Sequence, residues 1–120
     1  MPRYVILRHE IPSPERGPVH WDFMLERDGI LRTWALAEEP TVQREIAADQ
    51  LADHRLAYLD YEGPISPDRG SVTRWDAGEY QLAGESADEL QISLKGQKLS
   101  GEVRLRRAEE PHRWRFTFST

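Results

Sequence analysis

The sequence predicts a mainly β domain: a small closed β-barrel of about eight antiparallel strands with one surface helix. Short stretches of alternating apolar and polar residues recur along the chain, as in 89–94, where Leu90, Ile92 and Leu94 fall on one face. Turns rich in glycine and proline separate these stretches at regular spacing. The chain has 120 residues, of which 38% are hydrophobic, so it can bury a core. We therefore expect one domain over residues 1–120.

Three strands are expected at the start of the chain. Residues 4–9 are rich in strand-forming side chains and end on His9, and residues 20–26 and 30–36 follow an alternating pattern. Asp28-Gly29 between the last two predicts a two-residue hairpin, because glycine accepts the positive φ of such a turn. Prolines and a glycine make 10–19 a loop. Since the chain leaves at His9 and returns at His20, both histidines should lie at the base of that loop.

The one helix is expected over 42–52. Thr41 is a typical N-cap, and the segment that follows it is rich in Ala, Glu, Gln and Leu. His54 and Tyr58 should lie where this helix gives way to extended chain. Further strands are predicted over 71–75, 79–83, 89–94, 98–107 and 113–118, with turns at 66–70 and 76–78.

Composition excludes several kinds of protein. No cysteine is present, which rules out disulfides and thiolate metal sites, so any metal would bind His, Asp or Glu. Such ligands suit Mn, Zn or Fe. The net charge of -5 argues against broad, nonspecific binding of nucleic acid. No apolar run approaches the ~20 residues of a membrane span, and the first residues lack the layout of a signal peptide. We therefore expect a cytoplasmic protein without a membrane partner.

The stretch 20–26 carries the candidate metal ligands. In a strand, His20 and Asp22 share a face, so an imidazole and a carboxylate can bind one ion together. Either His9 or His54 can supply the third ligand. One set is His9, His20 and Asp22; the other is His20, Asp22 and His54, the arrangement of two-His-one-carboxylate iron sites. Spacing alone leaves both sets open, and each would leave coordination positions for water or substrate.

Three stretches resemble the 3'-phosphoesterase domain of bacterial DNA ligase D and its stand-alone relatives. Residues 4–9 are similar to the opening strand of that family, which ends in a basic residue and histidine. Residues 20–35 are similar to its His-Tyr-Asp-Phe-Arg-Leu-Glu-x-Asp-Gly-x-Leu-Lys-Ser-Trp-Ala motif, the most specific of the three. Residues 53–63 are similar to its Asp-His-Pro-Leu-x-Tyr and Phe-Glu-Gly motifs. The resemblance extends over nearly the whole chain.

The resemblance implies a compact β-barrel and a manganese-dependent phosphoesterase, with another divalent metal such as Zn as the alternative ion. Such an enzyme removes a 3'-phosphate or a terminal ribonucleotide from DNA and leaves a hydroxyl that a ligase can join. By residue, the resemblance implies His9, His20 and Asp22 as metal ligands, His54 as an acid or phosphate contact, and Tyr58 as a further substrate contact. The implied partners are DNA 3' ends, together with DNA ligase or other end-joining proteins.

Two departures from the family pattern bear on phosphate binding. Met24 stands where the family has an arginine, and Glu38-Glu39 replaces its Lys-Gly. Arg8, Arg55 and Arg69 are the predicted substitutes for the missing cation, as substrate-binding residues. Two alternatives stand beside the phosphoesterase: a non-catalytic member that binds DNA ends or a repair partner, and, from the second ligand set, a non-haem iron oxygenase.

Overall fold

The computed structural model describes residues 2–11, 19–66 and 69–120. Its strands are β1 (Arg3–Glu10), β2 (His20–Arg27), β3 (Ile30–Leu36), β4 (Ile46–His54), β5 (Gly63–Ser66), β6 (Gly70–Glu85), β7 (Glu89–Gly96), β8 (Ser100–Arg107) and β9 (Arg113–Ser119), with a short 3-10 helix, η2 (Leu56–Leu59). The loop expected over 10–19 and the turn expected over 66–70 fall mostly or partly on 12–18 and 67–68, which lie outside the described residues.

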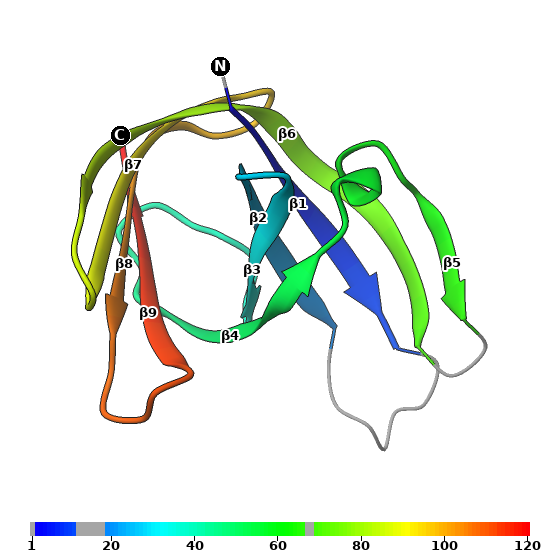
Figure 1. Ribbon diagram of the computed structural model, residues 1–120, viewed down its shortest axis with the longest axis horizontal. Helices are drawn as coiled ribbons and strands as arrows, with labels where there is room; N and C mark the ends of the chain where they lie inside the picture. The colour runs from blue at the N-terminus through cyan, green and yellow to red at the C-terminus, as the bar shows by residue number, and fades with distance from the viewer. Residues whose placement is uncertain (1, 12–18, 67–68) are drawn as a thin grey trace.

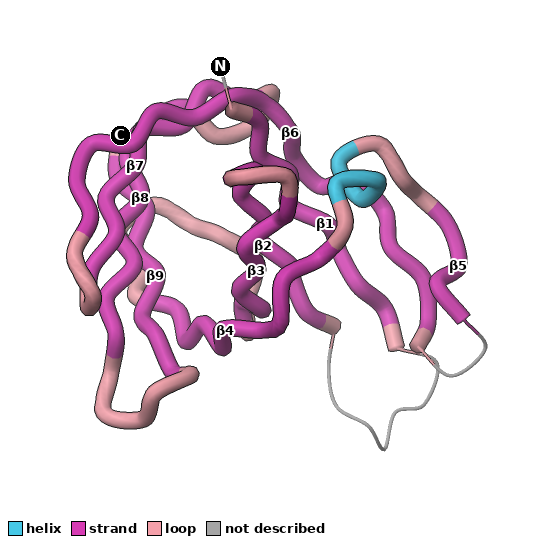
Figure 2. The backbone as a smooth tube through the Cα atoms, in the orientation of Figure 1, coloured by secondary structure: helices cyan, strands magenta, loops and turns pink. Residues whose placement is uncertain are grey.

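The strands close into an antiparallel barrel. Their order is β1-β2-β3-β4-β9-β8-β7-β6-β5, and β6 also pairs with β1. Eight strands therefore form a ring, and β5 lies outside it (Figure 1, Figure 2). β6 reaches both neighbours because it is 16 residues long: its first half pairs with β1 and its second half with β7. The predicted closed barrel is confirmed.

The hairpin between β2 and β3 is the one that Asp28-Gly29 predicts. Arg27 pairs with Ile30, so the loop has only two residues. Their φ angles are 53° and 83°, and two positive values in succession are typical of a type I' turn. Because the turn sets the register, it also decides which residues of the two strands face the barrel interior.

The helix predicted over 42–52 is wrong. Most of this segment is β4, which pairs with β3 on one side and β9 on the other. Ile46 and Ala48, two residues apart, are fully buried, whereas Leu51 is exposed, which is the period of a strand. Helix propensity amounts to tenths of a kcal/mol per residue and is overridden by two rows of inter-strand hydrogen bonds. The described residues contain no helix long and apolar enough to cross a membrane.

The turn predicted over 76–78 is also wrong, because β6 runs straight through it. Opposite β1, the pairing jumps from Asp76 to Arg74, so Trp75 is the extra residue of a bulge. Asp76 is buried and accepts hydrogen bonds from the Tyr4 hydroxyl at 2.5 Å, from the Lys98 amide at 2.7 Å, and from one further amide. Burial, followed by this hydrogen bond, raises the pKa of Tyr4. Aspartate serves here as a buried acceptor instead of a turn residue.

Each of the first two strands has two different faces. Tyr4 and Ile6 on β1, with Phe23 on β2, belong to the aromatic core that fills the barrel. The intervening residues point outward and, together with residues of β3, η2 and β6, form a second, smaller apolar cluster, here called the outer cluster. Its members are Val5, Leu7, Met24, Leu31, Leu59 and Val72. Figure 1 shows η2 and β5 on this side, next to β1 and β6. The outer cluster is the floor on which the candidate site is built.

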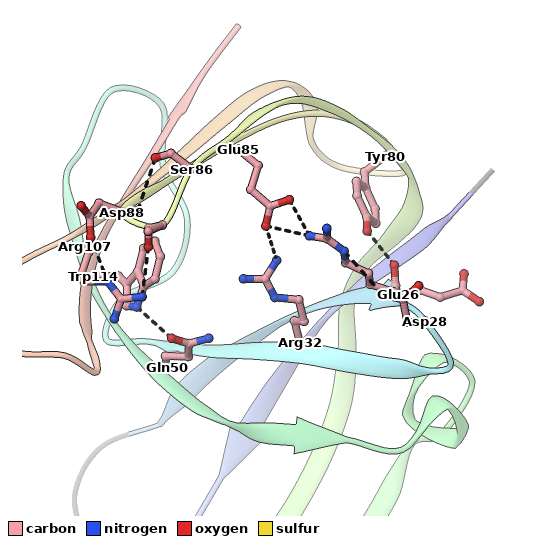
Figure 3. Close-up of polar contacts among 12 residues, drawn as sticks. Glu26, Asp28, Arg32, Gln50, Tyr80, Glu85, Ser86, Asp88, Arg107 and Trp114 are labelled. Carbon is pink, nitrogen blue, oxygen red and sulfur yellow. Dashed lines mark hydrogen bonds and ion pairs between the residues drawn. The ribbon is translucent and has the colours of Figure 1, made fainter.

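A polar contact joins β6 to the β2–β3 hairpin, although these strands are not neighbours in the barrel. Near the end of β6, Glu85 accepts hydrogen bonds from Arg27 at 2.7 Å and Arg32 at 3.2 Å. The Tyr80 hydroxyl donates to the Glu26 carbonyl at 2.6 Å. Figure 3 shows Glu85 and Tyr80 of β6 reaching toward Arg32 and Glu26 of the hairpin. The hydrogen bond from Arg27 lowers the pKa of Glu85.

Candidate functional site

The candidate ligands meet on the outer face of β1 and β2. His9 lies directly opposite His20 in the antiparallel register, and Asp22 lies opposite Leu7. Residues directly opposite each other project to the same face. The His9 Nδ1 atom is 3.2 Å from the Asp22 Oδ2 atom, and the centroids of the two imidazole rings are 6.3 Å apart. By alternation along β1, His9 shares this outer face with Val5 and Leu7.

The other nitrogen of His9 is held by the backbone. Its Nε2 atom is 2.6 Å from the Arg69 carbonyl oxygen, which only accepts, so Nε2 carries a hydrogen. Gly70 makes this approach feasible: its φ is +80°, and a Cβ there would lie 1.8 Å from the Glu10 carbonyl oxygen. The hydrogen bond with Asp22, and then the one with the Arg69 carbonyl, raise the pKa of His9. With Nε2 protonated, Nδ1 and the carboxylate face each other.

A positive charge between Nδ1 and the carboxylate satisfies both atoms, and that charge is either a proton or a metal ion. Two adjacent ligands of one metal lie ~3.0–3.4 Å apart when the bonds are ~2.1 Å long, which matches the separation of 3.2 Å between His9 and Asp22. Asp22 is only 4% exposed, and its Oδ1 atom has no hydrogen-bond partner in the described part of the chain. A buried carboxylate oxygen in this state favours a cation. The donor set therefore fits a divalent metal.

The third predicted ligand, His20, does not complete a three-ligand cluster with His9 and Asp22. Within residues 2–11, 19–66 and 69–120, no three His, Asp or Glu side chains are arranged so that they hold one ion. His9 and Asp22 are in contact, and His20 lies beside His9 with its ring nearly perpendicular, at 73°. The arrangement amounts to a prepared pair of ligands with one further imidazole adjacent.

A cleft of about 260 Å³ opens next to this pair and includes both His9 and Asp22. His54 borders it too, from the end of β4, where its Nδ1 atom lies 2.9 Å from the Ala52 carbonyl oxygen. Because that oxygen only accepts, Nδ1 carries the hydrogen, and exchange of a proton with a substrate falls to Nε2. The Tyr58 ring, also in the cleft, meets the His54 ring edge-on at 5.6 Å.

Two of the three predicted substrate-binding arginines reach the cleft. Arg55 and Arg69 line it, together with the acidic residue Asp53. Arg8 does not: it pairs with Trp21 and Thr73, on the opposite face from His9, and its guanidinium bonds to Glu10. The structure therefore brings His54, Tyr58 and two arginines to the prepared His–Asp pair, and leaves Arg8 outside that group.

The floor of the cleft was missed by sequence reasoning. It is apolar and includes Met24, which is 1% exposed and belongs to the outer cluster, together with Val72 and Ile65. The sequence carried one signal for this, because Val5, Leu7 and Met24 are apolar at positions that alternate with the barrel core. The residue that replaces the family arginine is thus a packing residue beneath the site.

Fold and site together define a small β-barrel protein with a histidine–carboxylate pair and, on its outer wall, a cleft that two arginines line. The sequence model of one protein family, the DNA Ligase D 3'-phosphoesterase domain, matches residues 8–107. The chain belongs to this family, as its sequence motifs indicate.

Curated relatives support the assignment. The multifunctional non-homologous end joining protein LigD of Pseudomonas aeruginosa is 34% identical over 106 residues, which cover 80% of this chain and 13% of that protein. The protein of the same name from Mycobacterium bovis is 32% identical over 111 residues, or 85% of this chain and 14% of that protein. The one from Mycolicibacterium smegmatis is 29% identical over 104 residues. This chain therefore corresponds to about one seventh of each relative.

Proposed function

We propose that this protein is a divalent-metal-dependent phosphoesterase that acts on DNA 3' ends and removes a 3'-phosphate or a terminal ribonucleotide. The observation that carries the proposal is the His9–Asp22 pair, 3.2 Å apart with Asp22 buried, in the wall of a cleft that also holds His54, Tyr58 and two arginines. Family membership supports the same class of reaction.

The arginines of the rim would bind the substrate. A phosphoester carries negative charge, and the planar guanidinium group donates paired hydrogen bonds to phosphate oxygens. Arg55 and Arg69 are both exposed at the cleft, so they can adjust to the ligand. They would take the place of the family arginine that is Met24 here.

His9, His20 and Asp22 would hold the metal, with Mn as the preferred ion and Zn as the alternative. Such an ion, when bound, withdraws charge from a phosphate oxygen and makes water more acidic. Metal binding requires His9 Nδ1 to give up its proton, whereas the hydrogen bond from Nε2 to the Arg69 carbonyl can persist and orient the ring.

His54 would act as the general acid. Departure of a sugar alkoxide from phosphorus needs a proton, and a positioned histidine is the usual donor. The bond from Nδ1 to the Ala52 carbonyl fixes the ring and directs Nε2 to this task. Tyr58 packs edge-on against His54 and would contact the bound phosphate through its hydroxyl. Each group then has one role: attraction, metal binding or proton donation.

The biological setting follows from the substrate. A 3' end freed of phosphate or ribonucleotide is ready for sealing, so the proposed partners are DNA ends and, downstream, a DNA ligase or another end-joining protein. The relatives are bacterial end-joining proteins, and bacterial DNA lies in the cytoplasm, so the proposed location is the cytoplasm.

The test uses purified protein with a labelled primer that ends in a 3'-phosphate or in one ribonucleotide. We expect product with Mn and none after chelation. His20→Ala and Asp22→Ala should lose activity while the barrel stays folded, because both side chains lie on the outer face. His54→Ala should lower the rate by roughly 10²–10⁴-fold.

The matched control is His112→Ala, which removes an exposed histidine in the turn between β8 and β9 and should leave the rate unchanged. If metal-loaded protein leaves both primers intact, the proposal is wrong.

A second candidate function is a non-catalytic role in binding DNA ends. Met24 favours it, because an apolar side chain occupies the floor of the cleft where the family has a cation. It predicts that DNA binds without turnover and that His54→Ala leaves affinity unchanged. Turnover of either primer would eliminate it.

A further inference from the structure

A second hollow, of about 190 Å³, adjoins the cleft. Arg55, Tyr58 and Ile65 line both, so the two form one continuous depression. The second hollow is completed by Ala57, Tyr61 and Pro64, which come from η2 and from the chain that leads through β5. We call it the aromatic hollow. The role proposed above for the cleft makes no use of it.

The aromatic hollow is connected to the candidate acid by a row of rings. Tyr58 meets His54 at 5.6 Å and 74° on one side and Tyr61 at 5.9 Å and 88° on the other. Tyr61 is 38% exposed, yet its hydroxyl donates to the Pro64 carbonyl, which holds the ring in place. An exposed aromatic ring that is already fixed loses little conformational entropy when a flat ligand stacks on it.

The linings of the two hollows differ in a way that matches one kind of ligand. The cleft is polar and charged, with histidines, arginines and aspartates, whereas the aromatic hollow has apolar and aromatic walls with Arg55 at the shared rim. A nucleotide has this same division, with a charged phosphate at one end and a flat base at the other. Bases stack on aromatic side chains with little dependence on sequence.

Building on the proposed function, we infer that the aromatic hollow binds the base of the nucleotide whose 3'-oxygen carries the reacting phosphate, with Tyr61 as the stacking platform. The occupant is therefore part of the same DNA strand that places its end in the cleft. The hollow would position the strand, so that the phosphate comes to rest beside the His9–Asp22 pair.

The test measures the affinity of the full-length chain for a single-stranded oligonucleotide ending in a 3'-phosphate, by fluorescence anisotropy, without divalent metal. A second oligonucleotide is identical but lacks the base of its last nucleotide. We expect wild-type protein to bind the intact strand about 10-fold more tightly than the abasic one, since stacking of one base contributes a factor of roughly 5 to 150.

Variants then assign the effect to one ring. Tyr61→Leu should weaken binding of the intact strand to the level of the abasic one and leave abasic binding unchanged, whereas Tyr61→Phe, which keeps the ring, should retain the preference. Leu82→Ala is the matched control, because Leu82 is an exposed apolar residue of β6 outside both hollows. Thermal unfolding confirms that each variant is folded.

The outcomes separate this inference from the proposed function. Equal binding of the two strands by wild-type protein, or equal weakening of both by Tyr61→Leu, overturns the inference even if the protein cleaves primers. A preference that depends on Tyr61, in a protein that cleaves neither primer, supports the aromatic hollow and refutes the phosphoesterase. Absence of any binding overturns the inference as well.

Discussion

The buried hydrogen bond between Tyr4 and Asp76 should stabilise the pairing of β1 with β6, which closes the barrel. Tyr4→Phe removes only the hydroxyl, and with it the 2.5 Å contact to the Asp76 Oδ2 atom. Hydrogen bonds to a charged acceptor contribute about 1.5–3 kcal/mol. Asp76 keeps the amides of Lys98 at 2.7 Å and Leu99 at 3.2 Å, so the carboxylate is not left unpaired. We therefore expect a loss of about 2 kcal/mol in the free energy of unfolding.

The assay is urea unfolding followed by tryptophan fluorescence. With a slope of roughly 1–3 kcal/mol per molar urea, a loss of this size lowers the midpoint by about 1 M without changing the slope. Tyr80→Phe is the internal comparison: its hydroxyl donates to a neutral backbone carbonyl at 2.6 Å, and such a bond contributes only about 0.5–1.5 kcal/mol. If Tyr4→Phe lowers the free energy of unfolding by less than Tyr80→Phe does, the hydrogen bond to Asp76 does not have the strength expected for a charged acceptor.

Three further predictions concern a glycine, an ion pair and the corrected strand. Gly70→Ala should destabilise the protein by more than ~2 kcal/mol, because its Cβ would lie 1.8 Å from a backbone oxygen. Gly29→Ala, also at positive φ but in open space, should cost only ~1–2 kcal/mol. Thermal unfolding of the two variants measures this difference. The pKa of Glu85 is lowered from 4.5 in the folded protein, so its ion pairs stabilise the fold above pH 4.5, and this stabilisation is lost as the pH falls through the lower folded-state pKa. Glu85→Gln should therefore flatten the pH dependence of the unfolding midpoint below pH 4.5; an unchanged slope would contradict this. Ile46→Ala should lower the free energy of unfolding by about 2–5 kcal/mol and Leu51→Ala by under ~1 kcal/mol, because the first side chain is fully buried and the second is 39% exposed. Similar losses for the two variants in urea unfolding would place both side chains on one buried face, as in the predicted helix.

The parts of the fold that local chemistry decides were predictable from the sequence. Asp28-Gly29 specifies its hairpin because few other dipeptides tolerate two positive φ angles. Alternation in β2 placed His20 and Asp22 on one face, and the loop between His9 and His20 placed these two histidines side by side; the register confirms both. These inferences need only neighbours in sequence, which is why they succeed.

The parts that depend on distant partners were not predictable. Residues 46–54 have the composition of a helix, and only pairing with β3 and β9 makes them a strand. Asp76 resembles a turn residue until the Tyr4 hydroxyl from β1 and two amides from the turn between β7 and β8 satisfy its carboxylate. The contact of His9 with the Arg69 carbonyl spans 60 positions, and nothing in the local sequence announces it.

The alternation of core and site along β1 and β2 has a consequence for how this protein can change. Outward positions can accept new side chains while the barrel interior keeps the same residues, and Met24, in place of the family arginine, is a change of this kind. A slip of one residue in register, by contrast, would exchange the two sets and turn the histidines into the barrel. Libraries that seek a new specificity should therefore randomise outward positions such as Met24, retain His9, His20 and Asp22, and keep the strand lengths unaltered.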